Sequence, residues 1–243
     1  MRPCHSPARL YFPTWHEVNL SSRATGAPKR CALLSTAGSL LYHERGREID
    51  AHDLVIRTGQ APVHGFARYV GHRTDYRIMS VSLYESVRKM NVSRTREELA
   101  RETILYTKLP APQCGKIKEW HRQHKITRPY VCLGVGRPQC NVATRWSRHF
   151  SSGFESVFIA LLTLNCTHIT LLGFNSTENL NAPYHYWADG SYHDSTSARQ
   201  WYKDRGSTRY GHDFLAEQRV LASATRDSVL TRQSLAAVCD QRQ

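Results

Sequence analysis

Short apolar stretches alternate with helix-length segments along this 243-residue chain. Runs of apolar and β-branched residues predict strands, and we place them at residues 31–34, 54–57, 76–81, 103–107, 130–135 and 168–174. Apolar residues at helical spacing predict helices near residues 86–101, 115–123, 153–165 and 213–223. This alternation is typical of a largely parallel sheet with helices on both faces, which binds ligands at the carboxyl ends of its strands. We therefore expect a single Rossmann-like α/β domain.

Residues 151–174, SSGFESVFIALLTLNCTHITLLGF, combine a helix start with a following strand. Ser151 or Ser152 is suited to cap the helix, and Gly153 lets a ligand approach the backbone. The free N–H groups and the positive end of the dipole at such a helix start attract anions, commonly a phosphate or a carboxylate. The same residues also fit a plain helix cap without a ligand. The pattern therefore indicates function only together with a second part of the same site.

That second part lies upstream, in residues 31–79. The segment contains a cysteine, a strand, a turn with glycine, and then E-I-D-x-H-D, A-P, G-F and V-G-x-R-T in that order. This order resembles the large sialyl motif of the animal-type sialyltransferase family. The residues that match the family pattern are Cys31, Gly38, Glu48, Ile49, Asp50, His52, Asp53, Arg57, Ala61, Pro62, Gly65, Phe66, Val70, Gly71, Arg73 and Thr74.

Three further segments follow in the family order. Residues 151–174 resemble the small sialyl motif, residues 185–187 resemble the third motif, and His212 with Glu217 resembles the closing H-x-x-x-x-E motif. Four ordered motifs spread over residues 31–217 make a match that is far more specific than any one of them. The resemblance implies a GT-A-like variant of the Rossmann-like fold.

The resemblance also implies a reaction, the transfer of sialic acid from its cytidine monophosphate (CMP) ester to a hydroxyl group of a glycan, with inversion. Such a reaction needs a base for the acceptor proton and a cation or acid for the departing phosphate. Histidine suits both tasks because its unperturbed pKa lies near neutrality. By resemblance, His212 is the base and His185 is the partner of the phosphate. Without the motif set, His212 would read as an exposed helix-capping histidine, one of 13 in the chain.

Donor contacts follow from the same resemblance. The serine-glycine start of the small motif is expected to hold the donor's carboxylate, and the turns after the first and last predicted strands of the sheet are expected to meet the nucleotide. The full set of expected substrate-binding residues is Thr36, Ala37, Gly38, Gly59, Ser151, Ser152, Gly153, Gly173, Phe174, Tyr186 and Trp187. The chain has no D-x-D sequence, which many glycosyltransferases use to bind a metal with a nucleotide diphosphate. We therefore expect no metal and no cofactor besides the donor substrate.

Two departures from the family pattern affect donor binding. Family members usually carry asparagine in the turn after the first strand, where this chain has Thr36 within S-T-A-G, and again at the position of Gly59. The hydroxyl of Thr36 can replace one hydrogen bond, whereas Gly59 offers only backbone groups. Two alternatives therefore stay open: a related donor such as the CMP ester of Kdo, or a protein of this family that has lost catalysis.

Cysteines and glycosylation sequons bear on the cellular compartment. Four N-x-S/T sequons, at Asn19, Asn91, Asn165 and Asn175, suggest passage through a glycosylating lumen. The seven cysteines form neither a C-x-x-C pair nor a cluster with zinc-ligand spacing. The family resemblance implies a disulfide between Cys31 and Cys166, and two buried free thiols are the alternative.

The positive net charge of the chain favours an alternative class of protein. A net charge of +13 and a pI near 9.7 fit a nucleic-acid-binding protein. However, lysines and arginines are scattered without a run of five, and a basic surface also suits an enzyme that handles acidic sugar nucleotides. We therefore expect glycoprotein or glycolipid glycans, and not nucleic acids, as partners.

The proline-containing residues 1–30 are interpreted as a stem-like leader, and residues 31–243 as the catalytic domain. Family members are normally held in the Golgi membrane by an N-terminal helix. The longest apolar stretch here, Val157 to Leu164, is too short to span a bilayer. The resemblance thus implies a protein of the Golgi lumen, although the expected membrane anchor is not visible in this sequence.

Overall fold

The computed structural model describes residues 29–80, 102–109, 113–126, 128–134, 150–174, 182–187, 214–226, 229–231 and 233–235. The helix predicted near residues 86–101 lies outside these ranges. The predicted leader also lies outside them, except for Lys29 and Arg30, which belong to the first strand. Within these ranges, no helix combines the length and the apolar character needed to cross a membrane.

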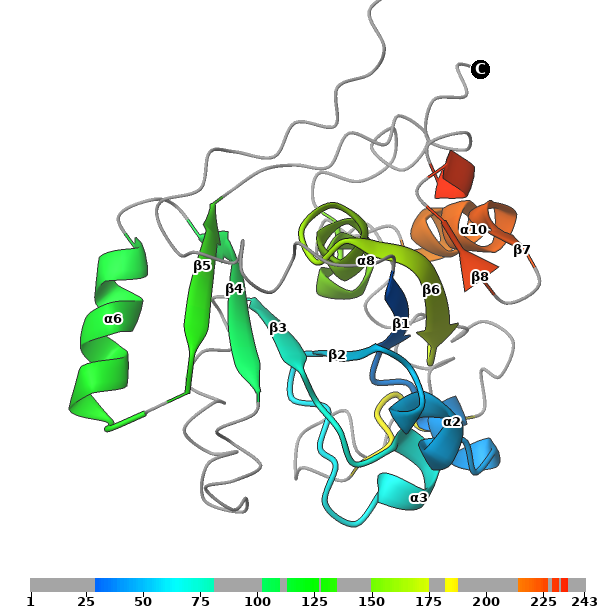
Figure 1. The fold of residues 1–243 in the computed structure, drawn as a ribbon, viewed down its shortest axis with the longest axis horizontal. Coiled ribbons are helices and arrows are strands. Elements are labelled where there is room, and N and C mark those ends of the chain that lie inside the picture. Colours follow the sequence, from blue (N-terminus) through cyan, green and yellow to red (C-terminus); the bar gives the residue numbers. More distant parts are fainter. Residues whose placement is uncertain are drawn as a thin grey trace, which may run out of the picture.

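An eight-stranded sheet runs through the described residues (Figure 1). Its strands are β1 (Lys29–Leu34), β2 (Leu54–Thr58), β3 (Tyr76–Ser80), β4 (Thr103–Leu109), β5 (Tyr130–Gly134), β6 (Cys166–Leu172), β7 (Thr225–Arg226) and β8 (Val229–Leu230). Their order across the sheet is β5-β4-β3-β2-β1-β6-β8-β7. Neighbours from β5 to β6 are parallel, whereas β8 is antiparallel to β6 and β7. The largely parallel sheet and all six predicted strands are therefore confirmed.

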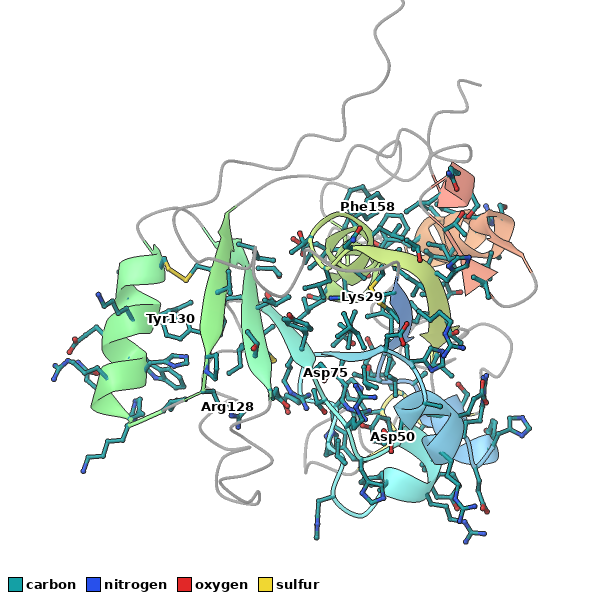
Figure 2. The ribbon with its side chains drawn as sticks, in the orientation of Figure 1. Lys29, Asp50, Asp75, Arg128, Tyr130 and Phe158 are labelled. Carbon is teal, nitrogen blue, oxygen red and sulfur yellow. A yellow bond between two sulfur atoms is a disulfide. The ribbon has the colours of Figure 1, made fainter. Side chains whose placement is uncertain are left out.

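Helices cover both faces of this sheet. Those in the described ranges are the 3₁₀-helix η1 (Gly38–Tyr42), α2 (Gly46–Asp50), α3 (Ala67–Val70), α6 (Gln113–Gln123), α8 (Ser152–Leu162) and α10 (Phe214–Ala224). On β1, Cys31 and Leu33 pack into the core under α8 and α10, where Phe158 lies over the sheet (Figure 2). Ala32 and Leu34 face the opposite core, under η1, α2 and α3. Because both faces are buried, β1 is apolar at consecutive positions, as is typical of parallel strands.

The strand order changes direction beside β1. Strands β2 to β5 lie on one side of β1, and β6 lies on the other. In open α/β sheets, ligands bind outside the carboxyl ends of the strands at such a switch point. Here Leu34 pairs with Leu172 at the ends of β1 and β6, and the N–H group of Ser35 donates to the carbonyl of Leu172 at 2.8 Å. The turns after β1 and β6 therefore start side by side, where a ligand site is expected.

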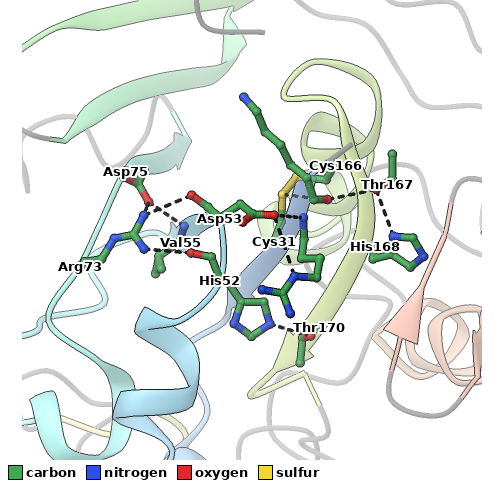
Figure 3. Close-up of a disulfide and its surroundings, with 12 residues drawn as sticks. Cys31, His52, Asp53, Val55, Arg73, Asp75, Cys166, Thr167, His168 and Thr170 are labelled. Atoms are coloured by element: carbon green, nitrogen blue, oxygen red, sulfur yellow. Dashed lines mark hydrogen bonds and ion pairs between the residues drawn. A yellow bond between two sulfur atoms is a disulfide. The ribbon is translucent and has the colours of Figure 1, made fainter. Parts of the chain in front are cut away.

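Two disulfides support the sheet. Cys31 on β1 is bonded to Cys166 at the start of β6, which confirms the pair implied by the family resemblance (Figure 3). Closing a loop with a sequence separation of 135 stabilises a fold by about 4 to 5 kcal/mol in the chain-entropy model. A second disulfide, Cys114–Cys132, ties α6 to β5. The sequence did not single out this pair, because spacing alone does not determine disulfide connectivity.

Several charged residues of the large motif tie together the amino ends of the strands. Asp53 accepts a hydrogen bond from the N–H group of Arg30 at 2.7 Å, and Asp75 accepts one from the N–H group of Val55 at 2.8 Å. Arg73 binds the Asp75 carboxylate at 3.0 Å and the Asp53 carbonyl at 3.2 Å (Figure 3). This network lies at the edge opposite the switch point. We conclude that this part of the motif supports the fold and does not touch a ligand at the switch point.

The motif arginine, Arg57, is also structural. Its side chain is fully buried, and its guanidinium donates to the Thr74 hydroxyl at 2.8 Å and to the carbonyls of Val70 and Arg73 at 2.7 Å each. These bonds hold the segment that follows α3 against β2.

Candidate active site

The turn after β1 and the segment 182–187 are fastened to each other. The N–H group of Gly38 donates to the carbonyl of Pro183 at 3.0 Å, and the N–H group of Tyr186 donates to the carbonyl of Thr36 at 3.1 Å. A side chain on Gly38 would collide with the Pro183 carbonyl, so this close approach requires glycine. Ala37, between them, is buried. The structure thus brings the large and third motifs together at the switch point.

The start of α8 completes this arrangement. The hydroxyl of Ser151 accepts a hydrogen bond from the N–H group of Phe154 at 3.1 Å, which confirms Ser151 as the helix cap. A Cβ atom placed on Gly153 would lie 3.5 Å from the ring of Phe174 and 3.8 Å from the hydroxyl of Ser35. The first turn of α8 therefore lies against both the turn after β1 and the turn after β6.

Glu217 of α10 occupies part of this helix start. Its carboxylate accepts hydrogen bonds from the N–H group of Ser151 at 2.6 Å and from the Ser151 hydroxyl at 2.5 Å. The donors of Ser151 are thus engaged, which argues against a direct contact with the donor carboxylate. The next N–H groups, on Ser152 and Gly153, have no carbonyl in a preceding helical turn to bind. Among the described residues, these two N–H groups remain for an anion.

Gly173 and Phe174 form the turn after β6. Gly173 has a left-handed backbone with φ of 72°, and a Cβ atom there would lie 2.8 Å from the side chain of Leu40. This position therefore requires glycine for both its backbone conformation and its packing. The carbonyl of Phe174 accepts a hydrogen bond from Gln218 of α10 at 3.3 Å. Both residues lie at the switch point, and their contact with the nucleotide stays a prediction.

Gly59 has the left-handed backbone conformation that its turn requires, and its N–H group is already hydrogen-bonded within the fold. Its φ of 59° lies in the left-handed region, which glycine and asparagine adopt most readily. Its N–H group donates to the carbonyl of Ile78 at 2.9 Å, and its carbonyl accepts from Arg77 at 2.9 Å. The N–H group of Gly59 is therefore engaged within the fold, and the expected role of Gly59 in substrate binding stays a prediction.

Beneath this turn lies a charged cluster that sequence patterns did not reveal. Arg77 binds the carboxylate of Glu102 through two nitrogens, at 2.8 and 3.1 Å, and Arg128 binds the same carboxylate at 2.7 Å. All three side chains are almost completely buried. Arg77 also binds the carbonyls of Gly59 and Ala61. The cluster therefore fixes the loop after β2 from below.

The third motif divides between core and site. Tyr186 is only 3% exposed, its hydroxyl donates to the carbonyl of Pro62, and its ring packs edge-on against Phe66. Tyr186 is therefore a core residue, which corrects its expected role in substrate binding. Its neighbours His185 and Trp187 are partly exposed and stack on each other, with ring centroids 4.5 Å apart and planes 15° apart.

His212, the expected base, lies outside the described residues. Helix α10 begins two residues later, at Phe214. Glu217 lies in the first turn of that helix and binds Ser151 at the start of α8. The sequence pattern singled out Glu217 but did not identify its partner, because the two residues are 66 positions apart.

Comparisons with known proteins agree with these motifs. The family model of glycosyltransferase family 29 (sialyltransferase) matches residues 9–128. The chain is similar to a beta-galactoside alpha-2,6-sialyltransferase 2 of Takifugu rubripes, with 33% identity over 44% of this chain and 20% of that protein. It is also similar to a CMP-N-acetylneuraminate-beta-galactosamide-alpha-2,3-sialyltransferase 1 of Gallus gallus, with 28% identity over 71% of this chain and 51% of that protein. The chain thus spans at most about half the length of these two curated relatives.

Solved structures show the same fold. A crystal structure of a mammalian sialyltransferase superposes with a TM-score of 0.55 at 20% identity, covering 81% of this chain and 65% of the other. A structure of a mammalian sialyltransferase in complex with Gal-beta-1-3GalNAc-ortho-nitrophenol gives a TM-score of 0.55 at 21% identity, covering 85% and 70%. At this identity the likeness concerns the fold alone.

Proposed function

Because the chain belongs to glycosyltransferase family 29, the sialyltransferases, we propose that it transfers sialic acid from CMP-sialic acid to a hydroxyl group of a glycan. One observation carries this proposal beyond family membership. The turn after β1, the start of α8 and the segment 182–187 meet at the switch point of the sheet. Three motifs that are far apart in the sequence thus lie side by side, at the place where open α/β sheets bind ligands.

In the proposed reaction, the acceptor oxygen forms a bond to the anomeric carbon of sialic acid. The bond from that carbon to the phosphate oxygen breaks, and its electron pair leaves with CMP. The proton of the acceptor hydroxyl passes to His212. A single displacement of this kind inverts the anomeric carbon, and it passes through an oxocarbenium-like state as other glycosyl transfers do.

The site supplies groups for each part of the donor. The N–H groups of Ser152 and Gly153, at the positive end of the α8 dipole, suit the sugar carboxylate. The hydroxyl of Thr36 and the ring of Phe174 border the turns where the nucleotide is expected. His185, held on the turn after β1 by its neighbour Tyr186, is the proposed partner of the phosphate.

We also propose that the reaction needs no metal ion or other cofactor. A monophosphate donor carries less charge than a diphosphate, and the site offers helix N–H groups and a histidine to balance it. The proposed compartment is the Golgi lumen, where glycoprotein and glycolipid glycans are the acceptors. The two disulfides support an oxidising compartment of this kind.

A related CMP-sugar donor is the second candidate. Gly59 stands where the family usually carries a donor-binding asparagine, and its N–H group is engaged with Ile78. A side-chain contact to the donor is therefore replaced or lost. The CMP ester of Kdo is the alternative donor, and a protein without transferase activity is the further outcome.

A transfer assay on a glycan array separates these candidates. We expect sialylated product from CMP-sialic acid, release of one CMP per product, and unchanged activity in EDTA. Product from the CMP ester of Kdo alone would support the second candidate. Binding of CMP without transfer to any glycan would indicate the inactive form, and activity that EDTA abolishes and manganese restores would contradict the metal-free site.

A further inference from the structure

Two aromatic rings contact the imidazole of His185. The indole of Trp187 lies nearly parallel to the imidazole, with centroids 4.5 Å apart, and the ring of Tyr184 lies 4.6 Å away at a tilt of 56°. Both distances are within the range of about 6 Å over which an aromatic ring attracts a cation. The imidazole is stacked on the indole of Trp187, so its protonated form gains from that ring.

Packing against the core and against Tyr186 holds the side chain of Trp187 in place. Its indole packs against the buried core under η1, α2 and α3, and it meets the ring of Tyr186 edge-on at 4.9 Å. Tyr186 in turn donates hydrogen bonds to the carbonyl groups of Thr36 and Pro62. A continuous set of contacts therefore leads from the turn after β1 through Tyr186 and Trp187 to His185.

The charge of His185 matters if it faces the departing phosphate. As the bond between the sugar carbon and the phosphate oxygen breaks, the electron pair stays on that oxygen, and a protonated imidazole stabilises the resulting charge. Tryptophan is the aromatic side chain that attracts cations most strongly. Among the described contacts of the 182–187 segment, the turn 35–38, Pro62 and Phe66 carry no charged side chain, and Tyr184 contributes a titratable ring beside His185.

We propose that Trp187 is a positioning residue that orients the imidazole of His185 and favours its protonated form. This inference rests on the proposed function for the use made of that proton. The inference goes beyond the proposed function because it gives Trp187 of the third motif a part in the chemistry through His185.

The test compares Trp187→Leu with Trp187→Phe. The titration midpoint of the His185 signal is measured by NMR, with His185→Gln used to assign that signal and the exposed His168 as internal reference. We expect Trp187→Leu to lower the midpoint by roughly half to one pH unit. Trp187→Phe, which keeps an aromatic face, should retain most of the wild-type value. Thermal unfolding shows that the variants are folded.

Activity gives the second readout. Because a phosphate partner must be protonated, turnover falls as the pH rises through the midpoint of His185. Trp187→Leu should therefore move this basic limb of the rate profile to lower pH by the same amount, while Trp187→Phe should not.

An unchanged midpoint in Trp187→Leu, or equal losses in the leucine and phenylalanine variants, would overturn the inference. Failure of the proposed function is a different result. In that case the wild-type protein transfers no sugar at any pH, while the NMR midpoint still reports whether Trp187 stabilises the charged imidazole.

Discussion

Glu217 binds Ser151 through both carboxylate oxygens, at 2.6 Å to the N–H group and 2.5 Å to the hydroxyl. The contact joins the first turn of α10 to the cap of α8. Glu217 is only 3% exposed, and the negative charge lies where the helix dipole of α8 stabilises it. The closing motif of the sequence therefore holds the small motif in place.

Replacement of Glu217 should destabilise the fold. In Glu217→Ala the buried N–H group of Ser151 loses its acceptor, and such a loss costs about 1 to 3 kcal/mol. Glu217→Gln keeps one acceptor oxygen and should lose less. Chemical denaturation measures the free energy of unfolding of both variants. Arg219→Ala, on the exposed side of the same helix, is the matched control. Equal stability of Glu217→Ala and wild type would show that the contact has no energetic role.

The buried cluster under Gly59 predicts a larger effect. Glu102→Gln keeps the shape of the side chain but removes the negative charge that Arg77 and Arg128 both bind, and breaking a buried ion pair typically costs about 3 to 5 kcal/mol. We expect a marked fall in melting temperature. Glu119→Gln removes an exposed partner of Arg122 and should change it little. Similar melting temperatures for the two variants would contradict the structural role of the cluster.

His121 on α6 gives a pH dependence to stability. Its Nε2 atom lies 2.9 Å from the Tyr106 hydroxyl, and burial lowers the pKa of His121 to about 4. The unfolded chain has the ordinary histidine pKa of about 6.5, so it binds the proton first as the pH falls. His121 should therefore reduce stability by up to about 3 kcal/mol between about pH 6.5 and pH 4. Denaturation of His121→Gln at pH 7 and pH 4.5 should show a smaller loss than wild type, and an equal loss would refute this assignment.

The sheet was predictable because its central strands are buried on both faces and read as apolar runs, as on β1. The short helices α2 and α3 were not, since four or five residues carry too little periodicity to detect. The candidate site was predicted from the strand and helix alternation and from the order of the motifs, and Gly38, Ser151 and Gly153 of those motifs lie near one another at the switch point.

Other features could not be predicted, because they depend on contacts between residues that are far apart in the sequence. Tyr186 looked like a ligand residue within its motif, yet its ring fills the core next to Phe66. Arg77 and Glu102 are buried, whereas charged residues in a sequence are normally expected at the surface. The sequence pattern therefore did not reveal their ion pair. The pairing of Cys114 with Cys132 likewise needs the register of α6 on β5.

The most direct test of the account measures turnover and CMP affinity for the wild type, His212→Ala and His185→Ala, with CMP-sialic acid and a glycan that the wild type sialylates. Removal of a general base should lower the turnover of His212→Ala by about 10²- to 10⁴-fold while CMP affinity stays near the wild-type value. His185→Ala should lose both turnover and CMP affinity, because its partner is the phosphate. Near-normal turnover in His212→Ala, or unchanged CMP affinity in His185→Ala, would contradict the proposed mechanism at the switch point.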